Sequence, residues 1–232
     1  MTKGYYDSVL AGERLRRAYE MAPPRVQQYL QAEIEHILRY IRPGDRFLEV
    51  GCGYGRILAP LASRADLAIG IDTSLGSLVL GRRMLDRFSN IRLLQMNALR
   101  LAFGDGTFDC VACIQNGISA FHVDQKDLLR ESIRVTRPGG MVLFSSYSER
   151  FWENRLEWFR LQAEAGLLGE IDFEKTADGV IVCKDGFTAT TVEASQFLSL
   201  TADLDVETSI VEVNASSLFC EMIPRPAETT SP

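Results

Sequence analysis

The sequence predicts an α/β fold built on a doubly wound, mostly parallel sheet. Three observations lead to this prediction. Apolar segments recur along residues 46–145, segments with helical spacing lie between them, and the first apolar segment ends in a glycine-rich turn. Strands that are apolar on both faces and separated by helices are typical of a parallel sheet covered on both sides. Because crossovers between parallel strands are right-handed, such elements give a Rossmann-like arrangement.

The first half of the chain supplies the parallel part of this sheet. Apolar residues recur at helical spacing after Pro23 and Pro24, and the turn residues of 42–45 end that helix. His36 lies mid-helix between acidic residues, so we expect it at the surface. Five strands are expected to follow: Arg46–Val50, Leu67–Ile71, Ile91–Gln95, Phe108–Ile114 and Met141–Ser145. Helices are expected between them near 55–63, 75–88 and 124–135.

The pattern changes after Tyr147. An aromatic-rich helix is expected over 149–166, followed by a hairpin over 171–187 that turns at Asp178-Gly179. Next come a helix opened by a capping box at Thr190 and Glu193 and two antiparallel strands. We therefore expect one domain over 1–232, to which three segments are added: an N-terminal cap segment over 1–24, an inserted helix and hairpin over 148–189, and a flexible tail over 224–232.

Composition limits the function classes. The chain has 232 residues, is 46% hydrophobic and carries a net charge of −6, which argues against an open, nonspecific nucleic-acid surface. The five cysteines form no disulfide pattern, and Cys110 and Cys113 fall in one predicted strand with their side chains on opposite faces. We find no secretory signal and no apolar run long enough to span a membrane, so a reducing cytoplasm is the expected location.

The stretch FLEVGCGYGR at residues 47–56 joins a strand to a helix through three alternating glycines. Without a Cβ, a glycine loop lets the backbone approach a ligand closely, and the helix that follows offers unpaired amides. Asp72 ends the next strand, where its carboxylate can accept hydrogen bonds from both hydroxyls of a ribose. Together these features predict a site for a ribose-containing ligand.

Two ligand classes fit this loop, dinucleotides and S-adenosylmethionine. The dinucleotide fingerprint is G-x-G-x-x-G, whereas here the spacing is G-x-G-x-G and Arg56 and Ile57 follow. Glu49 also lies two residues before Gly51. Its carboxylate would repel a pyrophosphate but would attract a ligand with an ammonium group and a sulfonium. The residues therefore favour S-adenosylmethionine.

At these residues the sequence resembles the class I S-adenosylmethionine-dependent methyltransferases. LEVGCGYGR is similar to their first motif and GIDTS to their second, while LLRESIRVTRPGGMVLF resembles the family's helix, proline-glycine turn and fifth strand. The resemblance covers roughly residues 26–147 and 188–223. It implies a seven-stranded sheet whose final strand is antiparallel, and it says little about the methyl acceptor.

The resemblance also implies roles for individual residues. Glu49, Gly51 and Gly53, with Cys52 between the glycines, would hold the methionine end of the cofactor. Asp72 would bind the ribose with Thr73 beside it. Asn97 and Ala98 would lie at the edge of the adenine, and Gln115 and Asn116 would lie under the sulfonium. Many family members have Asp where Asn97 stands, and an Asn side chain can still pair with an adenine edge.

Methyl transfer requires mainly that the acceptor be held in line with the reacting methyl group, and a base is needed only if the acceptor brings its proton. Candidates for such a base are His122 and Tyr6, with Tyr5 and Tyr147 as further possibilities. No metal site is evident. We expect methyl transfer to a nucleophilic nitrogen, oxygen or sulfur atom of a small molecule, by a monomer or homodimer that binds neither nucleic acid nor membrane. The alternatives are a protein or peptide methyltransferase and an inactive cofactor-binding scaffold or sensor.

Overall fold

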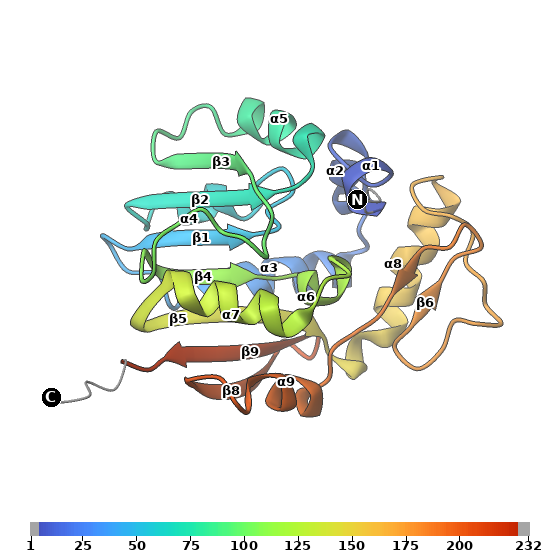
Figure 1. Cartoon of the computed structure of the whole chain (residues 1–232). Helices are drawn as coiled ribbons and strands as arrows, with labels where there is room; N and C mark the ends of the chain where they lie inside the picture. The colour runs from blue at the N-terminus through green and yellow to red at the C-terminus, as the bar shows by residue number, and fades with distance from the viewer. Residues whose placement is uncertain (1–4, 227–232) are drawn as a thin grey trace, which may run out of the picture.

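The computed structural model describes residues 5–226, which contain a seven-stranded sheet in the order β3-β2-β1-β4-β5-β9-β8 (Figure 1). Every neighbouring pair from β3 to β5 is parallel, whereas β9 runs antiparallel to both β5 and β8. The predicted fold class is therefore confirmed. The strands are β1 (Arg46–Val50), β2 (Leu67–Asp72), β3 (Ile91–Gln95), β4 (Phe108–Cys113), β5 (Thr136–Tyr147), β8 (Val206–Val213) and β9 (Ser217–Pro224).

Helices cover both faces of this sheet. One core cluster packs α3 (Pro24–Leu38) and α4 (Leu58–Leu61) against one face, and another packs α7 (Gln125–Val135) and α9 (Ala194–Thr201) against the other. Cys113 belongs to the second cluster and Cys110 to the first, so their predicted placement on opposite faces is confirmed. No helix among residues 5–226 is both long and apolar enough to cross a bilayer.

A third core lies beyond the carboxyl ends of the parallel strands (Figure 1). It joins the N-terminal helices α1 (Tyr5–Ser8) and α2 (Glu13–Glu20) to α8 (Trp152–Glu164) and to the small hairpin of β6 (Ile181–Val182) and β7 (Thr188–Ala189). We call this assembly the cap. Its buried members come from both ends of the chain: Leu10, Ala18, Ala22, Trp158, Phe159, Leu167, Ile181 and Phe187 among others.

The cap contains the predicted hairpin and one pairing that was not predicted, and it differs from prediction in one helix boundary. Asp178 and Gly179 form the turn, closed by two hydrogen bonds between Ala177 and Val180, and the antiparallel pairing resumes where Ile171 bridges Cys183. A second pairing joins β6 to β7. The helix after the hairpin is capped by Glu193 with Gln196, and not by Thr190, because these two side chains bond each other's backbone amides.

His36 is buried, contrary to the prediction of a surface position, with 3% of its area exposed. Its Nε2 lies 2.8 Å from Glu221 Oε1 on β9, and the Tyr40 hydroxyl donates to the same oxygen at 2.7 Å. Burial lowers the pKa of His36, and Glu221 opposes that effect. The imidazole therefore links α3 to the sheet on the side remote from the glycine loop.

Candidate active site

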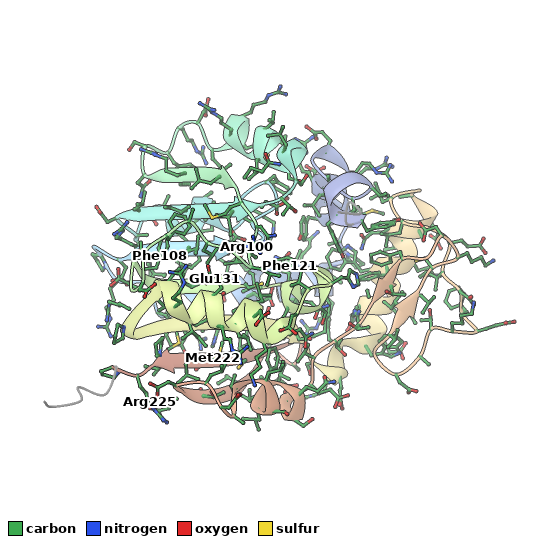
Figure 2. The ribbon with its side chains drawn as sticks, in the orientation of Figure 1. Arg100, Phe108, Phe121, Glu131, Met222 and Arg225 are labelled. Carbon is green, nitrogen blue, oxygen red and sulfur yellow. The ribbon has the colours of Figure 1, made fainter. Side chains whose placement is uncertain are left out.

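The glycine loop between β1 and α4 is held by backbone contacts to β2. The amides of Gly51 and Cys52 both donate to the Ile71 carbonyl at 2.9 Å. Gly51 has φ +78°, and a Cβ there would lie 2.2 Å from Phe121 Cζ. Only glycine fits both the backbone conformation and the close approach of this ring. Phe121 follows α6 (Gly117–Ala120), near which Figure 2 labels it.

Asp72, at the end of β2, fixes the geometry of two loops at once. Its Oδ2 accepts a hydrogen bond from the Gly53 amide and its Oδ1 accepts one from the Ser74 amide, each at 2.8 Å. Ser74 in turn caps α5 (Leu75–Met84) by accepting from the Ser77 amide. A carboxylate has about four acceptor positions, so these two bonds are compatible with further ones.

Glu49 places a second carboxyl group next to the loop. Only 5% of its area is exposed, and its Oε2 has no hydrogen-bond partner among residues 5–226. Burial raises the pKa of Glu49 well above its usual value, the Arg56 guanidinium lowers it, and Asp72 raises it further. Arg56 lies over the Tyr19 ring at 5.1 Å. A buried carboxyl with an unsatisfied oxygen favours a cationic ligand at this position.

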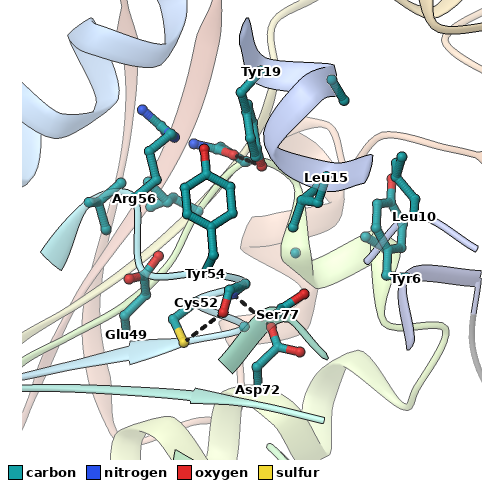
Figure 3. A pocket seen from close by; sticks show the side chains of 18 of the residues that line it. Tyr6, Leu10, Leu15, Tyr19, Glu49, Cys52, Tyr54, Arg56, Asp72 and Ser77 are labelled. Carbon is teal, nitrogen blue, oxygen red and sulfur yellow. Dashed lines mark hydrogen bonds between the residues drawn. The ribbon is translucent and has the colours of Figure 1, made fainter. Parts of the chain in front are cut away.

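The loop and the cap enclose one cavity of about 120 Å³. Figure 3 shows Glu49, Cys52 and Asp72 on the sheet side and Tyr6, Leu10, Leu15 and Tyr19 facing them from the N-terminal helices. The cavity is smaller than the several hundred cubic ångströms typical of ligand pockets. Phe121 over Gly51 and Leu15 over Gly53 account for part of the filled space, so a ligand must displace these side chains or the cap.

Aromatic residues form the cap side of the cavity. The Tyr19 hydroxyl donates to Gln115 Oε1, and the Trp158 indole donates to the Ala18 carbonyl at 2.9 Å. Burial raises the pKa of Tyr147 to about 12, so its hydroxyl stays protonated at neutral pH. The same wall contains Tyr6, Phe159 and Gln162. It is therefore apolar with a few hydroxyl and amide groups.

The comparisons with known proteins match the part of the chain that contains the glycine loop and Asp72. Residues 47–140 match a family described as a methyltransferase domain. A demethylmenaquinone methyltransferase from Corynebacterium kroppenstedtii is 36% identical over 46% of this chain and 44% of its own length. A ubiquinone/menaquinone biosynthesis C-methyltransferase from Legionella pneumophila is 34% identical over 48% of this chain and 46% of its own length. The chain thus spans less than half the length of these curated relatives.

Among solved structures, a putative S-adenosyl-L-methionine-dependent methyltransferase from Methanococcus maripaludis has the same fold. Its TM-score is 0.66 at 12% identity, and the alignment covers 95% of this chain and 96% of that one. The chain therefore has the fold of S-adenosylmethionine-dependent methyltransferases, and its residues 47–140 are similar to their methyltransferase domain. Both findings agree with the superfamily and the cofactor class predicted from the sequence.

The residues of this methyltransferase fold fit the cofactor on two observations. The unsatisfied Glu49 carboxyl suits the cationic methionine end, and the backbone at Gly51 and Gly53 carries no Cβ, so only the movable side chains of Phe121 and Leu15 cover it. When bound, S-adenosylmethionine supplies an activated methyl group. Seven of the twelve residues predicted from the sequence line the cavity: Tyr6, Glu49, Gly51, Cys52, Gly53, Asp72 and Gln115.

The other five predicted residues do not line this cavity. His122 is exposed, at φ +51° in the loop after α6. Asn97 is exposed and its Oδ1 accepts from the Leu99 amide, while Thr73 and Ala98 lie at the tips of β2 and β3. Asn116 is buried, and its amide bonds the Thr190 carbonyl and the Ser146 hydroxyl. The structure therefore gives Asn116 a role in joining β4, β5 and the segment after β7.

Other lining residues were not predicted from the sequence. Tyr19, Tyr54 and Arg56 lie within or beside the predicted segments, but only their contacts reveal them. Trp158 and Phe159 lie in the helix expected over 149–166, whereas Gln162 and Phe121 were not singled out. The available signal was the aromatic content of 149–166, which marks a packed helix without saying which face meets a ligand.

Proposed function

We propose that the protein transfers a methyl group from S-adenosylmethionine to a small molecule held under the cap. The observation that carries this proposal is the single cavity in which the glycine loop and Asp72 face an aromatic cap wall. A cavity closed by two separate chain segments suits a small acceptor better than a side chain of a folded protein. The unsatisfied Glu49 oxygen supports a ligand at this position, since keeping it buried without one costs stability.

The proposed roles of the residues follow from their positions. Glu49 holds the methionine end and Asp72 the ribose, as the superfamily resemblance implies. Thr73, Asn97 and Ala98 remain proposed contacts on the ribose and adenine side. Gln115 lines the cavity, where it is held by Tyr19 and by the hydrogen bond that its backbone amide donates to Ser145 Oγ at 2.9 Å. The cap residues orient the acceptor and exclude water.

The range of possible acceptor atoms is wider than the sequence alone predicts. Nitrogen, oxygen and sulfur are expected from the sequence, and the curated relatives named C-methyltransferases add carbon. No histidine lines the cavity among the described residues, and its carboxyl groups are those of Glu49 and Asp72, at the cofactor end. We therefore propose an acceptor that needs no protein base beside it, with His122 outside the reacting groups.

Turnover in a metabolite pool tests the proposal. Purified protein, methyl-labelled S-adenosylmethionine and the small-molecule fraction of a cell extract are expected to give a labelled small product. Heat-treated protein is the control. Label found only in the protein fraction would favour the peptide methyltransferase alternative, and absence of label together with tight cofactor binding would favour the scaffold.

The cap predicts a specific change in hydrogen exchange. Amides of α2 should exchange more slowly when S-adenosylhomocysteine binds, because Leu15 and Tyr19 of this helix line the cavity. Amides of α9, which packs on the opposite face of the sheet, serve as the internal reference. Unchanged exchange in α2 at saturating ligand would contradict a closing cap. Deleting residues 1–22 is a poorer test, because Leu10, Ala18 and Ala22 are buried in the cap core.

A further inference from the structure

A small niche of about 20 Å³ adjoins the main cavity. The two spaces have walls in common at Tyr6, Gln115, Ala120, Tyr147 and Phe159. This volume is about that of one water-sized atom, so it can hold a single oxygen of a ligand whose remainder occupies the cavity. The other walls of the niche come from α6 with the residue before it and from β7 with the residue after it: Asn116, Ser119, Thr188, Ala189 and Thr190.

Ser119 provides an unsatisfied hydroxyl in this niche. The residue is 7% exposed, and its Oγ has no hydrogen-bond partner in the part of the chain that the structure describes. The neighbouring Asn116 amide is already bonded to Thr190 and Ser146. A buried hydroxyl without a partner costs free energy, so the niche favours a ligand oxygen that accepts from Ser119.

Behind the niche lies the buried cation Arg155. Only 1% of its area is exposed, its Nε has no partner, and no carboxylate pairs with it within residues 5–226. Its guanidinium donates to the carbonyls of Gly179 at 2.7 Å and Ala189 at 2.9 Å. An unpaired buried charge is costly, and it makes its surroundings favourable for an anion.

The charge of Arg155 acts on the groups that form the niche wall. The guanidinium lies 4.5 Å from the centre of the Tyr147 ring and 5.4 Å from that of Phe159. Burial raises the pKa values of Tyr147 and Tyr6, and Arg155 lowers both. The carboxyl that faces Tyr147 from α3, Glu33, raises the Tyr147 pKa by less than Arg155 lowers it. At Tyr147 the charge of Arg155 therefore favours negative charge more than Glu33 opposes it, while burial opposes negative charge at both hydroxyls.

We infer that the acceptor is a phenol or enol that binds as its anion, with the oxygen in the niche between Tyr6, Ser119 and Tyr147. This inference rests on the proposed methyl transfer and specifies its substrate class. The three hydroxyls can donate to an oxyanion, and Arg155 supplies the compensating charge from behind. The acceptor loses its proton to solvent on binding, so the cavity needs no base at this end.

The ionisation of 4-nitrophenol tests this inference, because only its phenolate is yellow. Its absorbance is titrated with and without saturating protein loaded with S-adenosylhomocysteine. We expect the bound probe to titrate about one pH unit lower than the free probe, which corresponds to about tenfold tighter binding of the anion. No displacement of the titration, or a displacement to higher pH, would overturn the inference.

Three variants assign the effect to the niche. R155M removes the charge and should abolish the displacement, whereas R155K keeps the charge and should retain most of it. S119A leaves the Arg155 contacts to the hairpin intact, so it tests the niche even if R155M fails to fold, and it should reduce anion binding roughly threefold. An unchanged displacement in S119A or in folded R155M would contradict the assignment. Calorimetry with S-adenosylhomocysteine separates this result from failure of the proposed function, since cofactor binding can succeed while anion preference is absent.

Discussion

Replacing Asp72 by alanine should weaken binding of S-adenosylhomocysteine by about 1.5–3 kcal/mol, the scale of hydrogen bonds to a charged group. The carboxylate bonds the Gly53 and Ser74 amides, so it holds the glycine loop and the start of α5 in one arrangement. The superfamily resemblance adds bonds to the ribose. Isothermal titration calorimetry of wild type and D72A measures the difference as a change in Kd.

Two further variants separate the causes. D72N keeps one oxygen for a loop amide but replaces the other by a donor, so we expect its Kd to lie between those of wild type and D72A. D86A removes an exposed carboxylate from the loop after α5 and should leave the Kd unchanged. Equal affinities for wild type and D72A would remove Asp72 from the cofactor site, and no binding by wild type would remove the proposed function itself.

The sheet could be predicted from the sequence because its signals are local. β1 and β3 begin and end where the apolar runs of the sequence do, and the glycine loop and Asp72 are read from spacing alone. β5 is longer than the predicted Met141–Ser145, since Thr136 pairs with Phe108 across an irregularity in register. A turn sequence such as Arg-Pro-Gly-Gly gives no local sign that it continues a strand.

The buried polar residues could not be predicted, because their burial depends on contacts between segments that are far apart in the sequence. His36 and Glu33 lie on α3, where the spacing of apolar residues does not decide whether these two polar side chains are buried or exposed. Their burial depends on partners far along the chain, Glu221 for His36 and Ser145 and Ser217 for Glu33. Arg155 is similar, because its partners are the backbone carbonyls of Gly179 at the hairpin turn and of Ala189 in β7, a strand that the sequence did not predict. Such contacts arise only once the tertiary fold brings the segments together.

Glu33 should make the protein less stable as the pH rises through neutrality. Its side chain is fully buried, and burial raises its pKa from 4.5 to about 7, against the opposing effect of the bonds donated by Ser145 and Ser217. Because the folded state holds this proton more tightly than the unfolded state, the stabilisation is complete below about pH 4.5 and is lost as the pH rises to about 7. At about 1.4 kcal/mol per pH unit, the loss attributable to Glu33 is about 3 kcal/mol.

The variant E33Q isolates this contribution. Its amide keeps an oxygen that can accept from Ser145 and Ser217 but cannot ionise, so the difference in unfolding free energy between E33Q and wild type should change by about 3 kcal/mol in favour of E33Q from pH 4.5 to pH 8. Any constant cost of the new amide cancels in this comparison. Urea unfolding at each pH supplies the values, and E35Q, an exposed carboxylate two residues along α3, is the matched control. A difference between E33Q and wild type that stays constant with pH would show that Glu33 is ionised in the folded protein throughout.

The Glu33 carboxyl also connects to the cavity. It accepts a hydrogen bond from the Ser145 hydroxyl, whose oxygen in turn accepts one from the Gln115 amide at the tip of β4. Proton loss from Glu33 therefore places a negative charge two hydrogen bonds from Gln115, a residue that lines the cavity. A cationic cofactor in the cavity would favour that charge and should lower the pH at which Glu33 ionises.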